Sequence, residues 1–222
     1  MLALALLTPR RAADLLGELS RAQAAPLFGR LPQVAAAAVL AQVPSAERAD
    51  LLAGFDEAAA EAVLAHAVPE VAESARRLAR YPADTAGGLM PMEFLAYPWD
   101  VRAAYVVGDL RRRAAVHSRY KVQYAYVTAG DGVLIGVLRL RDLLLAPADA
   151  RPTDVMTPNP VGVGAGALLD ELRRLFDRHP FFGPPVTDES GWLLGVVPAR
   201  TSGRRSGKRA STTLPRTDST VS

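Results

Sequence analysis

The sequence contains no cysteine and only three histidines among its 222 residues. The missing cysteine excludes disulfide frameworks, thiolate zinc sites and thiol nucleophiles. His66, His117 and His179 are far apart in the sequence, which argues against a metal site built from several histidines. Neither a Ser-His-Asp arrangement nor another catalytic constellation is visible, so we expect a protein that is not an enzyme.

Long hydrophobic runs are also missing. The apolar run from Leu2 to Leu7 is short and no basic residue precedes it, so it has neither the length nor the flank of a signal peptide. The longest later run, residues 34–41, falls well below the roughly 18 residues that a membrane-spanning helix needs. We therefore expect a soluble, cytoplasmic protein without membrane insertion.

The charge is unevenly distributed. The formal net charge is +3, but residues 199–222 hold six basic residues and one acidic residue, so this segment carries +5 and the remainder −2. Residues 200–222 are rich in Ser, Thr, Gly and Arg, which predicts a disordered tail. No aromatic residue alternates with its charges, so the tail does not predict specific nucleic-acid binding.

Residues 9–80 show apolar side chains at helical spacing, separated by recurring breaks. Alanine supplies much of the 50% hydrophobic fraction, which favours helices with small side chains. Thr8-Pro9 and Pro44-Ser45 predict helix starts. The helices would be about ten residues long, and helices this short must pack on neighbours to be stable. The first half therefore predicts a stack of short helices similar to an α-solenoid.

The second half repeats one pattern of elements. Each copy has a short strand, an amphipathic helix, and a hairpin with glycine in its turn. The matching segments are the strands 94–97 and 161–163, the helices 101–113 and 168–179, and the hairpins 127–138 and 186–197. A further short helix at 141–145 follows the first copy and has no counterpart after the second. The order β-α-β-β thus occurs twice.

This tandem β-α-β-β-α unit resembles a pair of CBS domains. The segment before it, residues 81–90 (YPADTAGGLM), resembles the junction of the MgtE family of magnesium transporters, where a helical N domain runs straight into a CBS pair. Residues 155–158 (VMTP) resemble the opening of the second CBS copy. Gly87-Gly88 lacks the Lys-Ser/Thr of a phosphate-binding loop and predicts a flexible turn at a helix end.

The resemblance covers roughly residues 10–198 and implies an α+β fold. It divides the chain into an MgtE N-like helical domain, a first CBS copy, a second CBS copy without its final helix, and the tail. The four ranges are 1–86, 87–148, 149–199 and 200–222. In the family the CBS pair continues into a connecting helix and a transmembrane pore, and this sequence shows neither.

The resemblance implies Mg²⁺ as a ligand. Family members hold Mg²⁺ between acidic faces of the N domain, the CBS pair and the connecting helix, because like-charged faces meet only when their charge is neutralised. By resemblance, the candidate ligands are Asp14, Asp50 and Asp170; the alternative is that each faces solvent early in a helix. Four further positions expected to be acidic carry Leu168, Pro180, Thr201 and Arg204.

The resemblance also implies a nucleotide, because CBS pairs often hold ATP or another adenine nucleotide between their copies. The usual pattern is Ser or Thr, two residues, then an Asp that binds the ribose. Residues 139–142 (RLRD) keep Asp142 but lack the hydroxyl. Tyr124 and Phe181 are candidates for the two sides of the base, and Arg141 for the phosphates. The alternative is that Tyr124 packs in the sheet and Asp142 caps the short helix.

Two functions follow as hypotheses. The first is a Mg²⁺-sensing regulatory module of an MgtE-type transport system, which works by neutralising acidic faces and has no transport activity of its own. The second is a CBS-containing interaction scaffold or adenine-nucleotide-binding regulator that has lost ion sensing. The resemblance implies a homodimer through the CBS pair. It also implies a membrane-embedded MgtE-like pore protein as partner, which would place the chain at the inner membrane.

Overall fold

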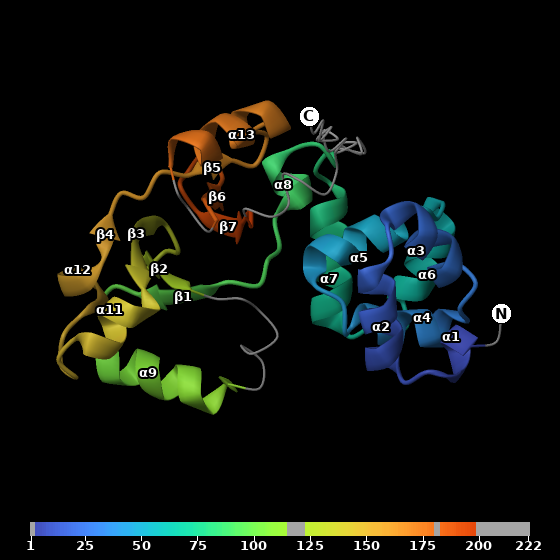
Figure 1. The fold of residues 1–222 in the computed structure, drawn as a ribbon, viewed down its shortest axis with the longest axis horizontal. Helices are drawn as coiled ribbons and strands as arrows, with labels where there is room; N and C mark the ends of the chain where they lie inside the picture. Colours follow the sequence, from blue (N-terminus) through green and yellow to red (C-terminus); the bar gives the residue numbers. More distant parts are fainter. Residues whose placement is uncertain (1–2, 115–122, 180–182, 199–222) are drawn as a thin grey trace, which may run out of the picture.

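The computed structural model describes residues 3–114, 123–179 and 183–198, and the predicted tail lies outside these ranges. The chain forms a helical lobe and an α/β lobe, with the short helix α8 (Ala86–Leu89) between them (Figure 1). The predicted order, a helical first half followed by a CBS-like second half, is confirmed.

The helical lobe consists of seven short helices. They are α1 (Ala3–Leu6), α2 (Pro9–Glu18), α3 (Arg21–Phe28), α4 (Gln33–Leu40), α5 (Ser45–Leu52), α6 (Glu57–Leu64) and α7 (Pro69–Ala79). The predicted starts at Thr8-Pro9 and Pro44-Ser45 are confirmed, and the Thr8 side chain accepts a hydrogen bond from the Arg11 amide. Asp56 caps α6 in the same way through the Ala59 amide, at 2.7 Å.

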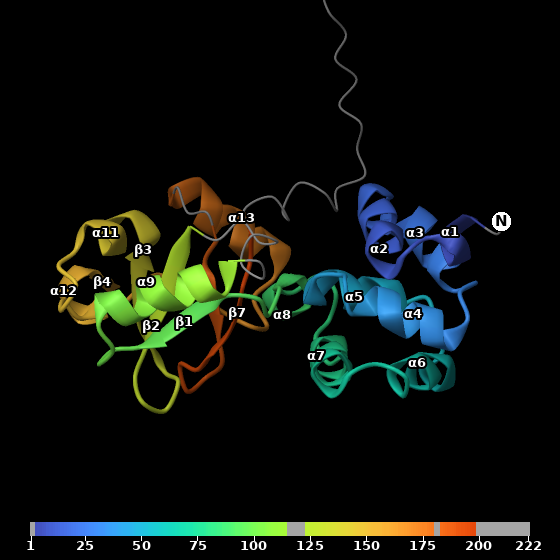
Figure 2. The same ribbon diagram turned by 90° about the horizontal axis from the view of Figure 1, so that it is seen from below.

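The packing of these helices follows a regular scheme. Helix α2 packs on α4 and α4 on α6, while α3 packs on α5 and α5 on α7, so each helix contacts the second one along the chain. Figure 2 shows the helices stacked in layers, with α2 and α3 above α4 and α5, and α6 and α7 below them. One continuous apolar cluster fills the interior, with Phe28 and Leu40 fully buried. Buried alanines such as Ala36 and Ala37 leave space for the helices to approach closely.

The α/β lobe contains the predicted repeat. The first copy consists of β1 (Leu95–Pro98), α9 (Ala103–Arg112), β2 (Tyr124–Thr128), β3 (Leu134–Arg139) and α11 (Leu140–Leu145). The second copy consists of β5 (Val163–Gly164), α13 (Leu169–Arg178), β6 (Pro185–Thr187) and β7 (Leu193–Val196). In both, the first strand runs parallel to the second, which forms an antiparallel hairpin with the third.

Two short elements lie between the copies. Helix α12 (Pro152–Val155) leads into β4 (Thr157–Pro158), which the repeat pattern did not predict. Strand β4 joins the first sheet, giving the order β1-β2-β3-β4, and the second sheet has the order β5-β6-β7. The hairpin turns of the two copies also meet, because Val133 forms a β-bridge with Trp192. Gly132 and Gly191, at φ +90° and +82°, provide the left-handed backbone that these turns require.

The segment that precedes each copy in the sequence packs against the sheet of the other copy. Ala86, Leu89 and Met90 belong to the core of the second sheet, where the Ala86 amide donates to the Ala167 carbonyl at 2.8 Å. Val155 and Met156 pack against the core of the first sheet. The two hydrophobic cores therefore do not follow the order of the repeats along the chain.

The expectation of a flexible turn at Gly87-Gly88 is wrong. Both glycines lie within α8, which Thr85 caps, and neither has a positive φ. The missing side chains matter for close packing instead. A Cβ on Gly87 would lie 2.5 Å from the Tyr81 ring, and a Cβ on Gly88 would overlap the carbonyl oxygen of Pro82. The glycines allow the Tyr81-Pro82 turn to fold back onto α8.

Candidate functional site

The structure brings the described nucleotide-binding candidates to one end of the first sheet. Tyr124 begins β2 and lies opposite Arg139, the last residue of β3. Helix α11 follows β3 directly, so Arg141 and Asp142 lie in its first turn. The Leu140 amide donates to the Gln123 carbonyl at 3.1 Å, which holds the start of α11 beside the start of β2. Phe181 lies outside the described residues.

The exposure of these side chains suits a ligand site. Arg141 and Asp142 are exposed and Tyr124 is half-buried, while the neighbouring Leu143 anchors α11 in the core. The alternative that Asp142 caps α11 is wrong, since Arg139 occupies the N-cap position without a side-chain capping bond. The exposed Arg139 also stands where the usual CBS pattern has its hydroxyl residue.

Tyr126 is a residue that the sequence reasoning missed. It lies two residues after Tyr124 in β2 and so shares a face of the strand with it. Its hydroxyl donates to the carbonyl oxygen of Gly183 at 3.1 Å, in the segment between α13 and β6 of the second copy. The face of β2 that carries both tyrosines is therefore directed toward the second copy. Burial raises the pKa of Tyr126, with a further contribution from Tyr124. The spacing of Tyr124 and Tyr126, two residues apart in a predicted strand, is the sequence signal that could have identified Tyr126.

The three candidate metal ligands lie on three different helices. Asp14 is exposed on α2, Asp50 is half-buried on α5, and Asp170 is exposed in the first turn of α13. Asp170 forms an ion pair with Arg173 at 3.0 Å, and its side chain is 79% exposed. Within residues 3–114, 123–179 and 183–198, no group of three or more His, Asp or Glu side chains could hold a metal ion.

Asp50 and Asp170 each follow a residue that packs against one common apolar cluster. These residues are Ala49 and Leu169, and the cluster is the core of the second sheet. Helix α5 of the helical lobe and α13 of the second copy therefore meet the same apolar cluster. Asp14 is about one helical turn before Gly17 on α2. At Gly17 this helix comes close to α5, because a Cβ there would lie 3.8 Å from the Glu47 carboxylate.

The positions expected to be acidic give no further ligand within the described residues. Leu168 precedes α13 as its N-cap residue, without a side-chain capping bond, and is 57% exposed. Pro180, Thr201 and Arg204 lie outside the described residues.

The helices α9 and α11 of the first copy line a small pocket and carry exposed apolar side chains. The pocket has a volume of about 280 Å³, and its lining includes Ala104, Gly108 and Leu144. Leu144 and Leu145 are 62% and 74% exposed, and Tyr105 on α9 is 54% exposed. None of the helices described is both long enough and apolar enough to pass through a bilayer.

Comparison with known proteins agrees with this architecture. Residues 1–84 match the family model described as the MgtE intracellular N domain. The chain is 37% identical, over 129 residues, to the magnesium transporter MgtE of Thermus thermophilus; this stretch covers 58% of the chain and 28% of that protein. The matched region thus spans little more than a quarter of that relative's length.

Solved structures extend the likeness to the α/β lobe. The crystal structure of the cytosolic domain of the Mg²⁺ channel MgtE in complex with ATP superposes with a TM-score of 0.82 and 32% identity, covering 90% of this chain and 81% of that one. The cystathionine β-synthase pair domain of a Mg²⁺ transporter homologue from Shewanella oneidensis shares the fold, with a TM-score of 0.55, 14% identity, and coverage of 73% and 93%. The helical lobe, the junction and the CBS pair together show that this chain belongs to the MgtE family.

Proposed function

We propose that this chain is a cytosolic Mg²⁺-sensing regulatory module of an MgtE-type magnesium transport system, without transport or catalytic activity of its own. The observation that carries the proposal is the placement of Asp50 and Asp170. They come from the helical lobe and from the second CBS copy, and each directly follows a residue, Ala49 or Leu169, that packs against one apolar cluster. A change of charge at Asp50 or Asp170 would therefore act on the contact between the helical lobe and the second CBS copy.

The donor chemistry fits magnesium. Mg²⁺ prefers oxygen ligands, keeps several of its waters, and is usually held by one or two carboxylates. The absence of a cluster of three donors among the described residues is compatible with such a hydrated ion. Asp50 and Asp170 would hold it, and Asp14 would add to the acidic face. A bound cation reduces the repulsion between carboxylates on facing surfaces.

The nucleotide part of the proposal concerns the end of the first sheet. Asp142 would bind the ribose of an adenine nucleotide such as ATP, Arg141 its phosphates, and Tyr124 one side of the base. Phe181 is the proposed second side. The support is the convergence of β2 and α11 at this place, together with the likeness to an MgtE cytosolic domain in complex with ATP.

The proposed homodimer uses exposed apolar side chains of α9 and α11. Tyr105, Leu144 and Leu145 would be covered by a second copy, in a homodimer through the CBS pair. The second partner is a membrane-embedded MgtE-like pore protein, which places the chain in the cytoplasm at the inner membrane.

Two observations favour the second candidate function. The carboxylate of Asp170 already pairs with Arg173 at 3.0 Å, and Leu168 stands where the family has an acidic residue. A chain in which these changes have removed ion sensing would act as an interaction scaffold or as an adenine-nucleotide-binding regulator.

A Mg²⁺ titration of thermal stability separates the two functions. A ligand that binds only the folded state stabilises it by RT ln(1 + [L]/Kd), or about 2.7 kcal/mol at 100 times Kd. We expect a saturable rise with Mg²⁺ that equal ionic strength of NaCl does not reproduce, and a weaker response to Ca²⁺. The rise should vanish in the triple variant Asp14→Asn, Asp50→Asn, Asp170→Asn.

A matched control removes three exposed acidic charges elsewhere, in Glu57→Gln, Asp149→Asn, Glu189→Gln. It should keep the Mg²⁺ response. A flat titration of the unmodified chain would reject Mg²⁺ sensing and leave the scaffold. A rise that survives in the triple variant would reject the three ligands.

A further inference from the structure

The two faces of β2 lie in different surroundings. Ala125 and Val127 belong to the apolar core that includes residues of α9 and α11. Tyr124 and Tyr126 alternate with them and therefore lie on the other face of the strand. Arg139 is the partner of Tyr124 on β3, so it shares this face. Tyr124, proposed to bind one side of the base, and Tyr126 are thus on the same side of the first sheet.

The second copy holds the hydroxyl of Tyr126. This side chain is buried, at 4% exposure, and its hydroxyl donates to the Gly183 carbonyl at 3.1 Å. Gly183 is itself fixed on the second sheet, because the Val197 amide donates to the carbonyl of the next residue, Pro184, at 3.1 Å. A Cβ on Gly183 would lie 2.8 Å from Val196 Cγ1, so the chain passes close to β7. The phenol therefore joins β2 to a segment that is packed on the other sheet.

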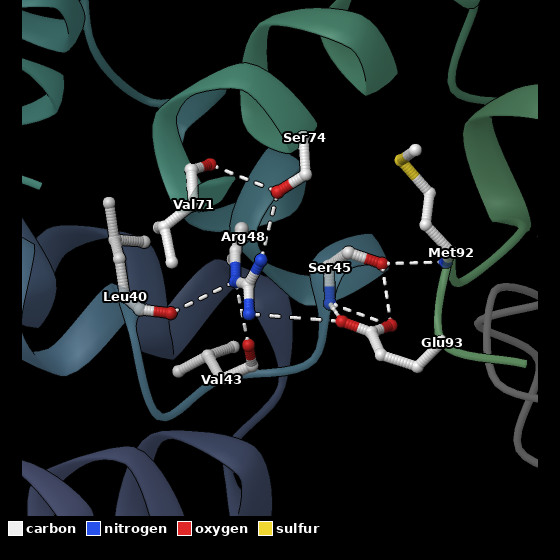
Figure 3. A network of polar contacts seen from close by, with 8 residues as sticks. All are labelled: Leu40, Val43, Ser45, Arg48, Val71, Ser74, Met92 and Glu93. Carbon is white, nitrogen blue, oxygen red and sulfur yellow. Dashed lines mark hydrogen bonds and ion pairs between the residues drawn. The ribbon is translucent and has the colours of Figure 1, made fainter. Parts of the chain in front are cut away.

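A second contact holds the ring of Tyr126. Phe94 meets this ring edge-on, with ring centroids 6.3 Å apart and an angle of 89° between the planes. The residue before Phe94 is Glu93, whose carboxylate accepts hydrogen bonds from the Ser45 amide at 3.0 Å and the Ser45 hydroxyl at 2.7 Å (Figure 3). Ser45 is the first residue of α5. The ring and the hydroxyl of Tyr126 are thus each fixed by a contact outside β2.

The position of Tyr126 bears on that of Tyr124. Residues two positions apart along one strand are about 6.6 Å apart. The bond from Tyr126 to Gly183 therefore sets the separation between the two copies one step along the strand from Tyr124. Phe181, proposed for the second side of the base, is two residues before Gly183 in the sequence. A gap of about 0.5–1 Å forfeits roughly a quarter to a half of the dispersion attraction between two surfaces, so a base bound between the copies depends on this separation.

We infer that Tyr126 is a positioning residue of the nucleotide site, which sets the separation of the two CBS copies where the adenine base binds. This role rests on the nucleotide binding proposed above. Tyr126 acts through Gly183 and Tyr124 rather than by binding the ligand itself. Because it acts on the base and not on the phosphates, its effect should be the same for adenosine and for ATP.

Isothermal titration calorimetry with adenosine and with ATP tests this role. The variant is Tyr126→Phe, which removes the hydroxyl and keeps the ring. The matched control is Tyr97→Phe, because Tyr97 is also buried in the first sheet but belongs to its core side, where its hydroxyl donates to Asp109 Oδ2 at 3.0 Å. Arg141→Gln provides the contrast, since it removes a charge proposed to bind the phosphates. Urea unfolding identifies the variants that are folded.

Tyr126→Phe should weaken the binding of adenosine and of ATP by the same factor, about two- to thirteen-fold for one lost hydrogen bond. Tyr97→Phe should lower the stability of the fold and leave both affinities unchanged. Arg141→Gln should weaken ATP binding about ten-fold, as expected for a hydrogen bond to a charged group, and adenosine binding far less. If Tyr126→Phe does not fold, Gly183→Ala decides the question, because its Cβ would lie 3.0 Å from the Val197 carbonyl oxygen and so displace the acceptor. It should give the same equal loss for both ligands.

Different outcomes would overturn the positioning role and the site itself. Equal affinities in Tyr126→Phe and in the unmodified chain would leave nucleotide binding intact and reject the role of Tyr126. A loss confined to ATP would place the effect at the phosphates, and an equal loss in Tyr97→Phe would make it one of general stability; either result rejects the role. If the unmodified chain binds neither ligand, the proposed nucleotide site is rejected and the positioning role with it.

Discussion

The hydroxyl of Tyr126 in β2 donates a hydrogen bond to the carbonyl oxygen of Gly183, at 3.1 Å, and so ties the first CBS copy to the second. The ring of Tyr126 also meets Phe94 edge-on, with ring centroids 6.3 Å apart. A second buried phenol, that of Tyr97, donates to Asp109 Oδ2 at 3.0 Å within the first copy. Both tyrosines need to stay neutral to keep these contacts.

The first prediction concerns stability at alkaline pH. Burial raises the pKa of both phenols, and for Tyr97 the hydrogen bond to Asp109 adds to this effect. Unfolded tyrosines ionise near pH 10. Above that pH the unfolded state loses protons that the folded state retains, so the free energy of unfolding should fall as the pH rises.

Urea unfolding between pH 8 and 11 measures this dependence. The double variant Tyr97→Phe, Tyr126→Phe should be less stable at pH 8 and lose less stability over the alkaline range. Tyr105→Phe is the control, because Tyr105 is 54% exposed. An equal alkaline loss in the double variant and in the unmodified chain would contradict the prediction.

The second prediction concerns the junction glycines. In Gly88→Ala the new methyl group would overlap the Pro82 carbonyl and lie 2.9 Å from the Ala83 Cα, and these are backbone atoms that cannot rotate away. We expect a loss of about 1–3 kcal/mol in the free energy of unfolding, as for other overpacked sites. Gly166→Ala adds the same methyl group where no atom lies within 4 Å and should change stability far less. Equal losses would disprove the packing role.

The third prediction concerns ATP binding and rests on the proposed function. Arg139→Thr restores the hydroxyl that the usual CBS pattern has three residues before its aspartate. One added hydrogen bond of about 0.5–1.5 kcal/mol corresponds to roughly two- to thirteen-fold tighter binding. Isothermal titration calorimetry measures the change, and Arg178→Thr, an exposed position on α13, controls for the lost charge. Unchanged or weaker binding in Arg139→Thr would speak against this site.

The fourth prediction concerns the ion pair on α13. Arg173 competes with a cation for the Asp170 carboxylate, and an exposed pair of this kind is worth about 0.2–1 kcal/mol. Arg173→Gln should therefore shift the Mg²⁺ midpoint of the stability titration to lower concentration by up to about five-fold. Arg174→Gln removes a neighbouring positive charge as the control. If both variants shift equally, the effect is one of general charge rather than of this pair.

Much of the fold was predictable because its signals are local. The Thr8-Pro9 start, the helical spacing of apolar residues and the glycines of the two hairpin turns depend on a few neighbouring residues. Strand β4 was missed because two residues carry no period, and it forms only where Gly136 and Val137 offer a free sheet edge. The Gly87-Gly88 prediction failed for a related reason, since the contact with Tyr81 and Pro82 is invisible in composition.

For the candidate site, too, the sequence predicted some of the positions and the packing decided the others. Sequence order alone places Asp142 shortly after a strand, but the pairing of Tyr124 with Arg139 across the sheet decides that Tyr124 lies at the same end. That Ala49 and Leu169 meet one cluster is likewise a result of packing between distant segments.

The sequence by itself determined most of the elements, their order and the family, because periodicity, caps and the junction motif depend on neighbouring residues. Only the tertiary structure decided that the segment before each copy packs against the sheet of the other copy. It also decided that the Glu93 carboxylate accepts the hydrogen bond of the first amide of α5. A charged residue has no local preference for a particular distant partner. The packing of the core decides which helix ends come within reach of the charged residue, and so decides its hydrogen bonds.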